Sequence, residues 1–336
     1  MPKKTIYELA RELEVAPSTV SKALNNKKGV NDESRKRIIQ YAKENGYFPN
    51  PTARALKSKK NNTIGILYSE GANVGLEHPF FSSVLQSAKE FFEENGYELI
   101  FINPKSNDYS GYKEFCLLRN IAGILIVCVS HKDAFLTELI SDSNFKLVAT
   151  DYIGDNVPTV LSNNVQGVKD LVKYFKKSKF KNVGLVIPTT DVRSFSERYE
   201  TFIDECKKAN INVLKENIIK VEDYSFENAR ISVCNYLNKT NKIPEAIFAL
   251  SDIYAAATIS AFKEKGYDIP KDCSIVGFDD IELSKYISPS LSTIRQNTKQ
   301  IGITSAKLLL AQLNDITINE YVVRVPVSLI IRQSSK

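Results

Sequence analysis

The pattern of apolar positions near the start of the chain predicts a short amphipathic helix. Ile6, Leu9 and Leu13 repeat at helical spacing and form one apolar face. Thr5 and Glu8 stand three residues apart, which is the spacing of a capping box at a helix N-terminus. We therefore expect a helix that begins just after Thr5.

Two more helices follow within the first fifty residues. The second spans residues 17–25, because Pro17 suits its first position and apolar residues recur on one side. Its other side presents Ser18, Thr19, Ser21 and Lys22. The third helix is capped by Asn31 and ends near residues 45–46. Two helices joined by a tight turn, the second short and polar-faced, indicate a helix-turn-helix, which places its second helix in the major groove of DNA. An ordinary three-helix cap with a solvated face stays the alternative.

From residue 62 onward the pattern alternates apolar strand-like runs with amphipathic stretches. A first series predicts strands at 63–68, 97–103, 123–128 and 146–150, with helices at 80–95, 109–120 and 131–141. A second series predicts strands at 182–187, 218–221, 246–250 and 274–278, with helices at 164–178, 194–210, 226–239 and 253–265. A strand at 292–296, a helix at 301–313 and strands within 322–327 complete the chain. This repeated alternation predicts an α/β body of two doubly wound parallel-sheet lobes.

Charge is divided unevenly between these two regions. Residues 1–60 hold 14 Lys and Arg against 6 Asp and Glu, whereas residues 61–336 hold 31 against 33. The whole positive surplus of the chain therefore lies in its first sixth. A basic head on a near-neutral body is typical of a protein that binds the phosphate backbone of nucleic acid.

The segment after the third helix adds a second indication of DNA binding. Asn50 suits an N-cap and Pro51 a first helical position, but residues 52–57 make under two turns, too few for a stable helix in water. Leu56 stands on this segment beside Arg54. We expect the helix to form in the minor groove of DNA, with Leu56 wedged between base steps.

Composition excludes several classes of protein. No apolar run is long enough to span a bilayer and no signal peptide precedes the first helix, so we expect a soluble, cytoplasmic protein. The five cysteines are widely spaced, and His78 and His131 are the only histidines, which makes metal sites and histidine-based catalysis improbable. Nucleotide-binding glycine loops are also missing after the first strand. We expect no enzyme activity, no metal and no cofactor.

The head resembles the DNA-binding domain of the lactose-repressor (LacI/GalR) family. The resemblance rests on residues 5–10, 18–25 and 46–50 and on Ala53-Arg54-x-Leu56. The family usually has Ser where this chain has Ala16, and Arg where it has Lys22, so a helix cap is lost and the base read by the second helix is less certain. The DNA contacts that we expect are Thr5, Pro17, Ser18, Thr19, Ser21, Lys22, Asn25, Asn50, Ala53, Arg54, Leu56 and Lys57.

The body resembles the effector-binding core of the same family, and this resemblance implies a division of the chain. It implies a helix-turn-helix head over 1–48 and a hinge over 49–61. The N-terminal lobe would comprise 62–161 with 292–322, and the C-terminal lobe 162–291 with 323–336. The chain would cross between lobes near 161–163, 290–294 and 322–328.

Ligands of open α/β sheets bind beyond the carboxyl ends of the strands. Polar and aromatic residues at the predicted strand ends, matched to the family's sugar site, give these effector contacts: Ser69, Phe80, Phe81, Asp151, Arg198, Ser251 and Asp279. For Arg198 a surface charge, for Asp279 a turn residue and for the two phenylalanines a core position stay the alternatives.

Together the residues and the resemblance predict a homodimeric transcriptional regulator. Its partners would be a pseudo-palindromic operator and a small sugar-like effector, and its most natural role a repressor of carbohydrate-utilisation genes. An activator, or a co-repressor-dependent regulator that responds to a non-sugar metabolite, stays the alternative.

Overall fold

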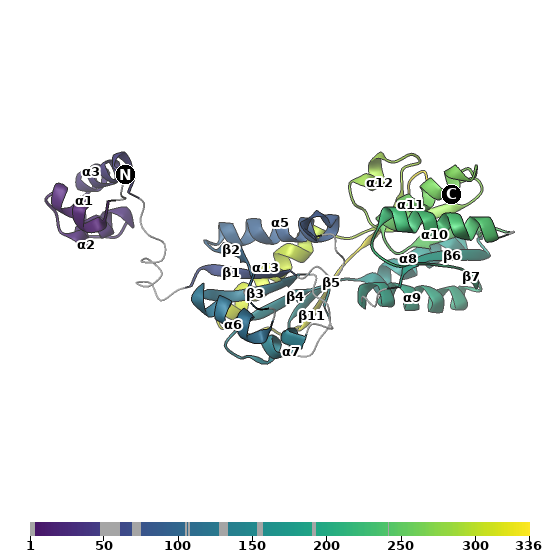
Figure 1. Cartoon of the computed structure of the whole chain (residues 1–336), viewed down its shortest axis with the longest axis horizontal. Coiled ribbons are helices and arrows are strands. Elements are labelled where there is room, and N and C mark those ends of the chain that lie inside the picture. Colours follow the sequence, from purple (N-terminus) through teal and green to yellow (C-terminus); the bar gives the residue numbers. More distant parts are fainter. Residues whose placement is uncertain are drawn as a thin grey trace. The chain divides into compact units, whose positions relative to one another are not determined.

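The computed structural model describes residues 4–47, 61–68, 75–104, 106, 108–127, 134–152, 157–189, 193–240 and 242–336 (Figure 1). The chain divides into two compact units, Met1–Asn62 and Thr63–Lys336, which we call the head and the body. The expected hinge helix over 50–57 lies outside the described residues.

The described part of the head contains three helices, α1 (Ile6–Glu12), α2 (Pro17–Leu24) and α3 (Asp32–Glu44). The capping box before α1 is confirmed: the Glu8 backbone N–H donates to the Thr5 hydroxyl at 3.3 Å, and the Thr5 N–H donates to the Glu8 carboxylate at 2.6 Å. Asn31 caps α3, as predicted. Ala16 occupies the N-cap of α2 and supplies no side-chain hydrogen bond there.

A small core and one arginine hold these helices together. The core consists of Leu9, Ala10, Leu13, Val20, Ala23, Ile38 and Ala42. Arg35 on α3 braces the connection that follows α2: it donates to the Asn26 side chain at 2.8 Å and to the Lys27 carbonyl at 3.0 Å. These contacts hold α2 at a defined orientation within the head.

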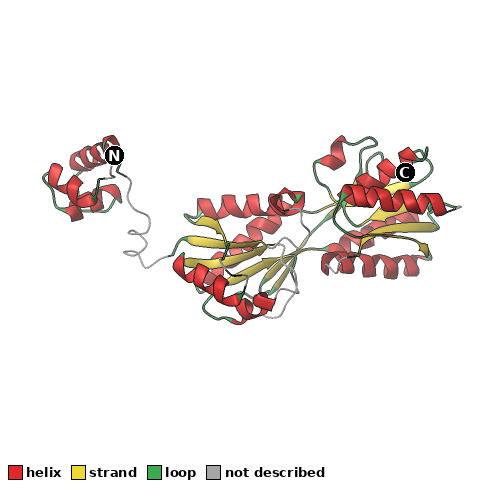
Figure 2. Cartoon of the chain, in the orientation of Figure 1, coloured by secondary structure: helices red, strands yellow, loops and turns green. Residues whose placement is uncertain are grey.

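The body contains two sheets with helices on both faces, so that each sheet is the middle layer of three (Figure 2). The first sheet is entirely parallel, in the order β2-β1-β3-β4-β5-β11. Its strands are β1 (Thr63–Tyr68), β2 (Glu98–Phe101), β3 (Ile121–Val127), β4 (Leu147–Thr150), β5 (Thr159–Ser162) and β11 (Val322–Val325). Helices α5 (Pro79–Glu94) and α13 (Thr298–Leu313) pack together on one side, and α6 (Tyr109–Leu118) and α7 (Ala134–Ser141) on the other. A short 3-10 helix, η1 (Gly75–Glu77), precedes α5.

The second sheet has the order β7-β6-β8-β9-β10-β12 and is parallel except for β12. Its strands are β6 (Asn182–Pro188), β7 (Asn212–Val221), β8 (Ala246–Ala249), β9 (Ser274–Asp279), β10 (Ser292–Arg295) and β12 (Ser328–Ile330). Helices α8 (Asn164–Lys177) and α9 (Arg193–Ala209) cover one face, and α10 (Phe226–Lys239) and α11 (Asp252–Glu264) the other, with α12 (Leu283–Tyr286) beyond β9.

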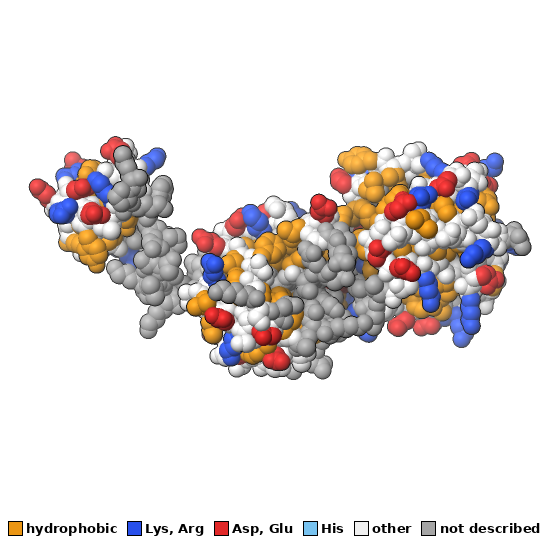
Figure 3. Space-filling model, in the orientation of Figure 1, with side chains coloured by type: hydrophobic (Ala, Val, Ile, Leu, Met, Phe, Trp, Pro, Cys, Tyr) orange, Lys and Arg blue, Asp and Glu red, His pale blue; other side chains and the backbone are white. Residues whose placement is uncertain are grey.

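The central strands are apolar along almost their whole length because helices bury both faces of each sheet. β4, β8 and β9 are buried at every position. The predicted architecture of a helical head and two doubly wound lobes is thereby confirmed. No helix in the described ranges is long and apolar enough to cross a membrane. On the face shown in Figure 3, acidic and basic side chains of the body are interspersed.

The predicted lobe boundaries are wrong at two places. Residues 292–295 form β10, which pairs with β9 and belongs to the second lobe, so the crossing expected at 290–294 falls after Arg295. Residues 323–325 belong to β11, which pairs with β5 in the first lobe. β5 itself was not predicted, and β7 begins six residues earlier than expected, at Asn212. The sequence of a short apolar strand does not indicate which of two sheets the strand joins. This explains the wrong lobe assignments of β10 and β11.

Candidate functional site

The outward face of α2 offers polar groups that nothing else in the described head engages. Ser18 and Lys22 are exposed, while Thr19 and Ser21 are half-buried. The side chains of these four residues form no hydrogen bond or ion pair with another described residue. Their donors and acceptors are therefore free for an outside partner.

Three other predicted DNA contacts have structural roles in the head. The Thr5 hydroxyl caps α1, and Pro17 is the first residue of α2. The Asn25 amide donates to the Ser21 carbonyl at 2.7 Å and so closes the C-terminus of α2. The remaining expected contacts, Asn50, Ala53, Arg54, Leu56 and Lys57, lie outside the described residues.

In the body, Arg198 on α9 is the centre of a buried group of charges. Its Nε donates to the Asn164 side chain at 3.0 Å, and its Nη1 donates to the Leu250 carbonyl at 2.8 Å. The guanidinium carbon lies 3.6 Å from the centre of the Phe278 ring. The residue is only 4% exposed, so the alternative of a surface charge is wrong for Arg198.

Two carboxylates accompany this arginine. Asp279, at the end of β9, lies 3.8 Å from Arg198 Nη1 and accepts a hydrogen bond from Gln296 at 2.6 Å. Asp151 follows β4 and accepts a hydrogen bond from Ser194. Burial raises the pKa of each carboxyl to about 6, although the nearby Arg198 charge lowers both. Both acids have positive φ, at 54° for Asp151 and 124° for Asp279, which places their side chains at sharp turns after the strands.

An aromatic group from both lobes adjoins these charges. His78, just before α5, stacks on Tyr224, just after β7, with ring centres 4.7 Å apart and planes at 22°. His78 also lies 4.7 Å from the ring of Phe81. Burial lowers the pKa of His78 to about 4, so the imidazole is neutral at pH 7. Its buried Nδ1 has no hydrogen-bond partner among the described residues.

A chain of hydrogen bonds runs from this site to all three crossings between the lobes. Asn164, which follows the first crossing, joins Arg198 to Glu197, because its Nδ2 donates to the Glu197 carboxylate at 3.0 Å. Glu197 is also held by both terminal nitrogens of Arg324 on β11, at 2.8 and 3.1 Å. Gln296, at the second crossing, bonds Asp279. We call Asp151, Asn164, Glu197, Arg198, Asp279, Gln296 and Arg324, with the rings of His78, Phe81 and Tyr224, the interlobe cluster.

The structure thus brings Asp151, Arg198, Asp279 and Phe81 together, and Ser251 directly follows Leu250, whose carbonyl accepts from Arg198. Phe80 and Phe81 both pack within the first lobe's core, which is the alternative stated for them, and Phe81 in addition lies against His78. Ser251 is fully buried and caps α11, with its hydroxyl accepting from the Tyr254 N–H at 3.3 Å. Ser69 lies outside the described residues.

Sequence reasoning missed His78, Tyr224 and the amide and charged residues that link the crossings. Tyr224 stands three residues beyond Val221, where both the predicted strand and β7 end, so the rule that selected Asp151 could have selected Tyr224 as well. His78 directly precedes the selected turn at Phe80 and Phe81. Among the described residues, no cluster of His, Cys, Asp and Glu could hold a metal ion.

Comparison with known proteins extends over both units. Residues 5–50 match the model of bacterial regulatory proteins of the lacI family, and residues 172–335 match the periplasmic binding protein-like domain. The HTH-type transcriptional repressor PurR of Pasteurella multocida is 28% identical over 340 residues, covering 99% of this chain and 98% of that protein.

Solved structures give the same result for the fold. The lac repressor dimer bound to operator and the anti-inducer ONPF has a TM-score of 0.86 at 22% identity, with 99% of each chain covered. A putative LacI transcriptional regulator from Bacillus cereus subsp. cytotoxis has a TM-score of 0.74 at 26% identity, covering 82% of this chain and 99% of that one. The head therefore contains a DNA-binding domain of the lacI family of bacterial regulatory proteins, and the body contains a periplasmic binding protein-like domain with the same fold as the lac repressor.

Proposed function

We propose that this chain is a homodimeric transcriptional repressor that reads a pseudo-palindromic operator with α2 of each head. The free polar face of α2 supports this role, because a recognition helix needs side chains that are not already engaged. Several relatives carry the name of transcriptional repressors, and one structure of the same fold is a dimer bound to operator. A monomer at micromolar concentration, with undiminished operator affinity, would contradict the dimer.

We propose further that a sugar-like effector binds at the interlobe cluster. The observation that carries this step is the set of the buried Arg198 and Asp279 and the half-buried Asp151 beside the aromatic rings of Phe81 and Tyr224. Sugar hydroxyls donate to carboxylates and accept from a guanidinium, while the C–H face of a sugar packs on aromatic rings. One structure of the same fold is a cellobiose complex, with a TM-score of 0.73.

A flat nitrogen heterocycle is the second candidate effector. The near-parallel stack of His78 on Tyr224 is itself a neutral heterocycle seated on an aromatic ring of this cluster. The relatives named PurR favour the same class of ligand.

A thermal-shift screen of mono- and disaccharides, sugar phosphates and purine bases separates these candidates. A ligand at about 100 times its Kd stabilises the folded state by about 2.7 kcal/mol, enough to raise Tm measurably. A sugar hit whose shift disappears in Arg198→Met supports the first candidate, and a purine hit that behaves in this way supports the second. A screen without any hit that depends on Arg198 would contradict the effector site.

The segment over 50–57 is proposed to link effector and operator. We expect Leu56→Ala to leave the heads folded and non-specific DNA binding intact, and to lower both operator affinity and DNA bending. An operator complex whose bend angle and affinity are unchanged by Leu56→Ala would rule out the wedge.

A further inference from the structure

A cavity of about 570 Å³ lies in the second lobe, away from the interlobe cluster. Its lining comes from the start of β6, the first part of β7, the last turn of α10 and the segment between α10 and β8. Tyr224 and Asp279 of the interlobe cluster stand at or just beyond the carboxyl ends of β7 and β9, so the cavity is at the opposite end of the same sheet. Its volume lies within the range of small-molecule sites.

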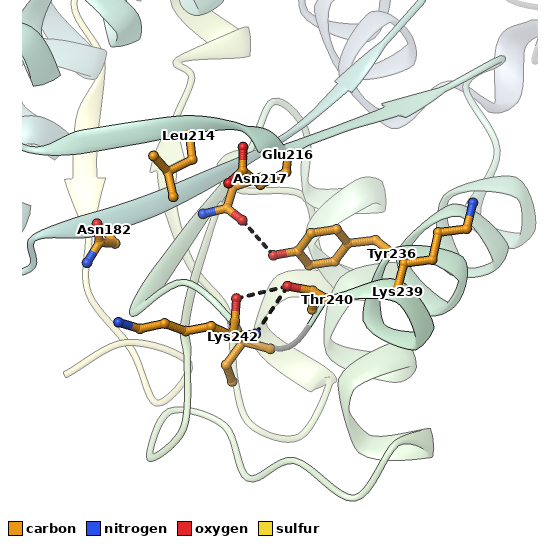
Figure 4. A pocket seen from close by; sticks show the side chains of 9 residues that line it. Asn182, Leu214, Glu216, Asn217, Tyr236, Lys239, Thr240 and Lys242 are labelled. Carbon is orange, nitrogen blue, oxygen red and sulfur yellow. Dashed lines mark hydrogen bonds between the residues drawn. The ribbon is translucent and has the colours of Figure 1, made fainter.

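A bulge in β7 creates the cavity. Val183 pairs with Val213 and Leu185 with Ile218, so that residues 214–217 face a single residue of β6, Gly184. A Cβ at Gly184 would lie 3.0 Å from the Asn217 carbonyl oxygen, which shows how closely the bulge approaches β6. Bulges of this kind redirect side chains, and here they turn Leu214 and Asn217 towards the cavity (Figure 4).

The cavity contains hydrogen-bond donors without an acceptor. Asn217 is only 4% exposed, and its Oδ1 accepts from the Tyr236 hydroxyl at 2.8 Å, while no described residue accepts from its Nδ2. The Asn182 Oδ1 is likewise used, by the Asn212 amide at 3.3 Å, which leaves Asn182 Nδ2 free. The Lys242 ammonium has no carboxylate partner among the described residues. These donors line the cavity without an acceptor among the described residues, so they are available to a ligand.

The charges that line this region are mainly positive. Lys239 and Lys242 line the cavity together with one carboxylate, Glu216. A smaller adjoining hollow of about 280 Å³ shares Tyr236 and Lys239 and adds Lys220. Three lysines and one carboxylate therefore line the two hollows. Tyr236, Leu214 and Ile243 contribute apolar surface to the same cavity.

We propose that this cavity binds a small organic phosphomonoester. The phosphate would accept from Asn182, Asn217 and Lys242, and its carbon body would pack on Tyr236 and Leu214. Three donors on separate elements suit the tetrahedral oxygens of a phosphate dianion better than the two coplanar oxygens of a carboxylate. Strand β7 continues from this cavity towards Tyr224, seven residues beyond Asn217, so an occupant would contact an element that also leads to the interlobe cluster.

Calorimetric titration of the full chain with phenyl phosphate tests the proposal. We expect one saturable site per chain, with at least tenfold weaker binding in Asn217→Asp, which keeps the acceptor for Tyr236 but removes the donor. Lys242→Gln should have a similar effect and, because Lys242 is exposed, should not disturb folding. Lys181→Gln is the matched control, since this exposed lysine adjoins Asn182 but does not line the cavity.

Four outcomes would overturn the assignment. The first is that phenyl phosphate shows no saturable binding, and the second is that phenol binds as tightly as phenyl phosphate. The third is that Lys181→Gln lowers the affinity for phenyl phosphate as much as Lys242→Gln does. The fourth is that Arg198→Met lowers this affinity while the cavity variants do not. The last outcome would assign phosphate binding to the interlobe cluster. Failure of the cavity proposal can therefore be distinguished from failure of the proposed effector site.

Discussion

The polar face of α2 and the interlobe cluster differ in whether their polar side chains are already bonded within the protein. On α2, the exposed Ser18 and Lys22 make no bond to other described residues. In the interlobe cluster, Arg198 and Asp279 are buried, and each is bonded to other residues of the body. A partner of α2 only has to add contacts, whereas a ligand of the cluster has to replace existing ones. Effector affinity is therefore a difference between two sets of bonds.

The largest expected effect follows from removing the central charge of the cluster. Arg198→Met leaves the buried Asp279 and the half-buried Asp151 without their counter-charge, so we expect a loss of roughly 3–5 kcal/mol in the free energy of unfolding and loss of the effector response. Denaturant unfolding measures the change in the free energy of unfolding, and effector titration of operator binding measures the effector response. Arg193→Met, at an exposed position of the same helix, should change stability by less than about 0.5 kcal/mol. Unchanged stability and normal titration in Arg198→Met would show that the cluster is not a unit.

The raised pKa values of the two acids predict a pH dependence. With a folded pKa of about 6 against an ordinary value near 3.8, Asp151 and Asp279 keep a proton that the unfolded chain has lost. The unfolded state then binds fewer protons, so the contribution of the two acids to stability falls as pH rises from about 4 to about 6, by on the order of 3 kcal/mol per group. Affinity for a hydroxyl-donating effector should rise over the same window. Asp279→Asn should flatten both curves; identical curves in that variant would refute the assignment.

On α2, substitution should affect recognition without affecting folding. Lys22→Ala removes a side chain that has no partner in the described head, so stability should stay constant while discrimination against altered operator bases falls by about 1–3 kcal/mol. Binding isotherms with single-base operator variants measure this. Equal weakening on every sequence would instead make Lys22 a phosphate contact.

The ion pair that joins the two lobes should have a smaller effect. Glu197 and Arg324 form a two-point contact, but Arg324 is one-third exposed, so solvent screening limits the expected coupling to about 1 kcal/mol. A double-mutant cycle with Glu197→Gln and Arg324→Met measures it. The exposed pair Lys89–Glu93 is the reference and should give a coupling of about half a kcal/mol or less. Equal coupling energies in both cycles would show that the Glu197–Arg324 pair stabilises the protein no more than an exposed surface pair does.

The smallest effect concerns the uncapped start of α2. Ala16 has the extended backbone of an N-cap but no side-chain oxygen, so Ala16→Ser should stabilise the head by about 0.5–1 kcal/mol. Thermal unfolding of the full chain, followed through a probe in the head, detects this. Ala16→Val, which cannot cap, should not stabilise; a gain in both variants would assign the effect to something other than capping.

Much of the fold could be predicted because the apolar runs of buried parallel strands contrast clearly with the amphipathic helices between them. β5 escaped prediction because it is four residues long and lies close behind β4. Asp151, Arg198 and Asp279 could be found because strand ends and the family pattern mark them. The links made by Asn164, Glu197 and Arg324 could not, because they join residues up to 127 positions apart, and no local pattern encodes such pairs.

The hydrogen bonds through Asn164, Glu197, Gln296 and Arg324 also bear on how such proteins can be re-engineered. A graft of only the residues that face a ligand would leave Arg198 and Asp279 without Asn164 and Gln296, which hold their side chains in position. The smallest set of residues that could be transferred together to another protein is the seven charged and amide residues of the interlobe cluster, which come from both lobes. Changes of specificity in this scaffold should therefore accumulate as correlated substitutions at the crossings, including positions that never touch the ligand.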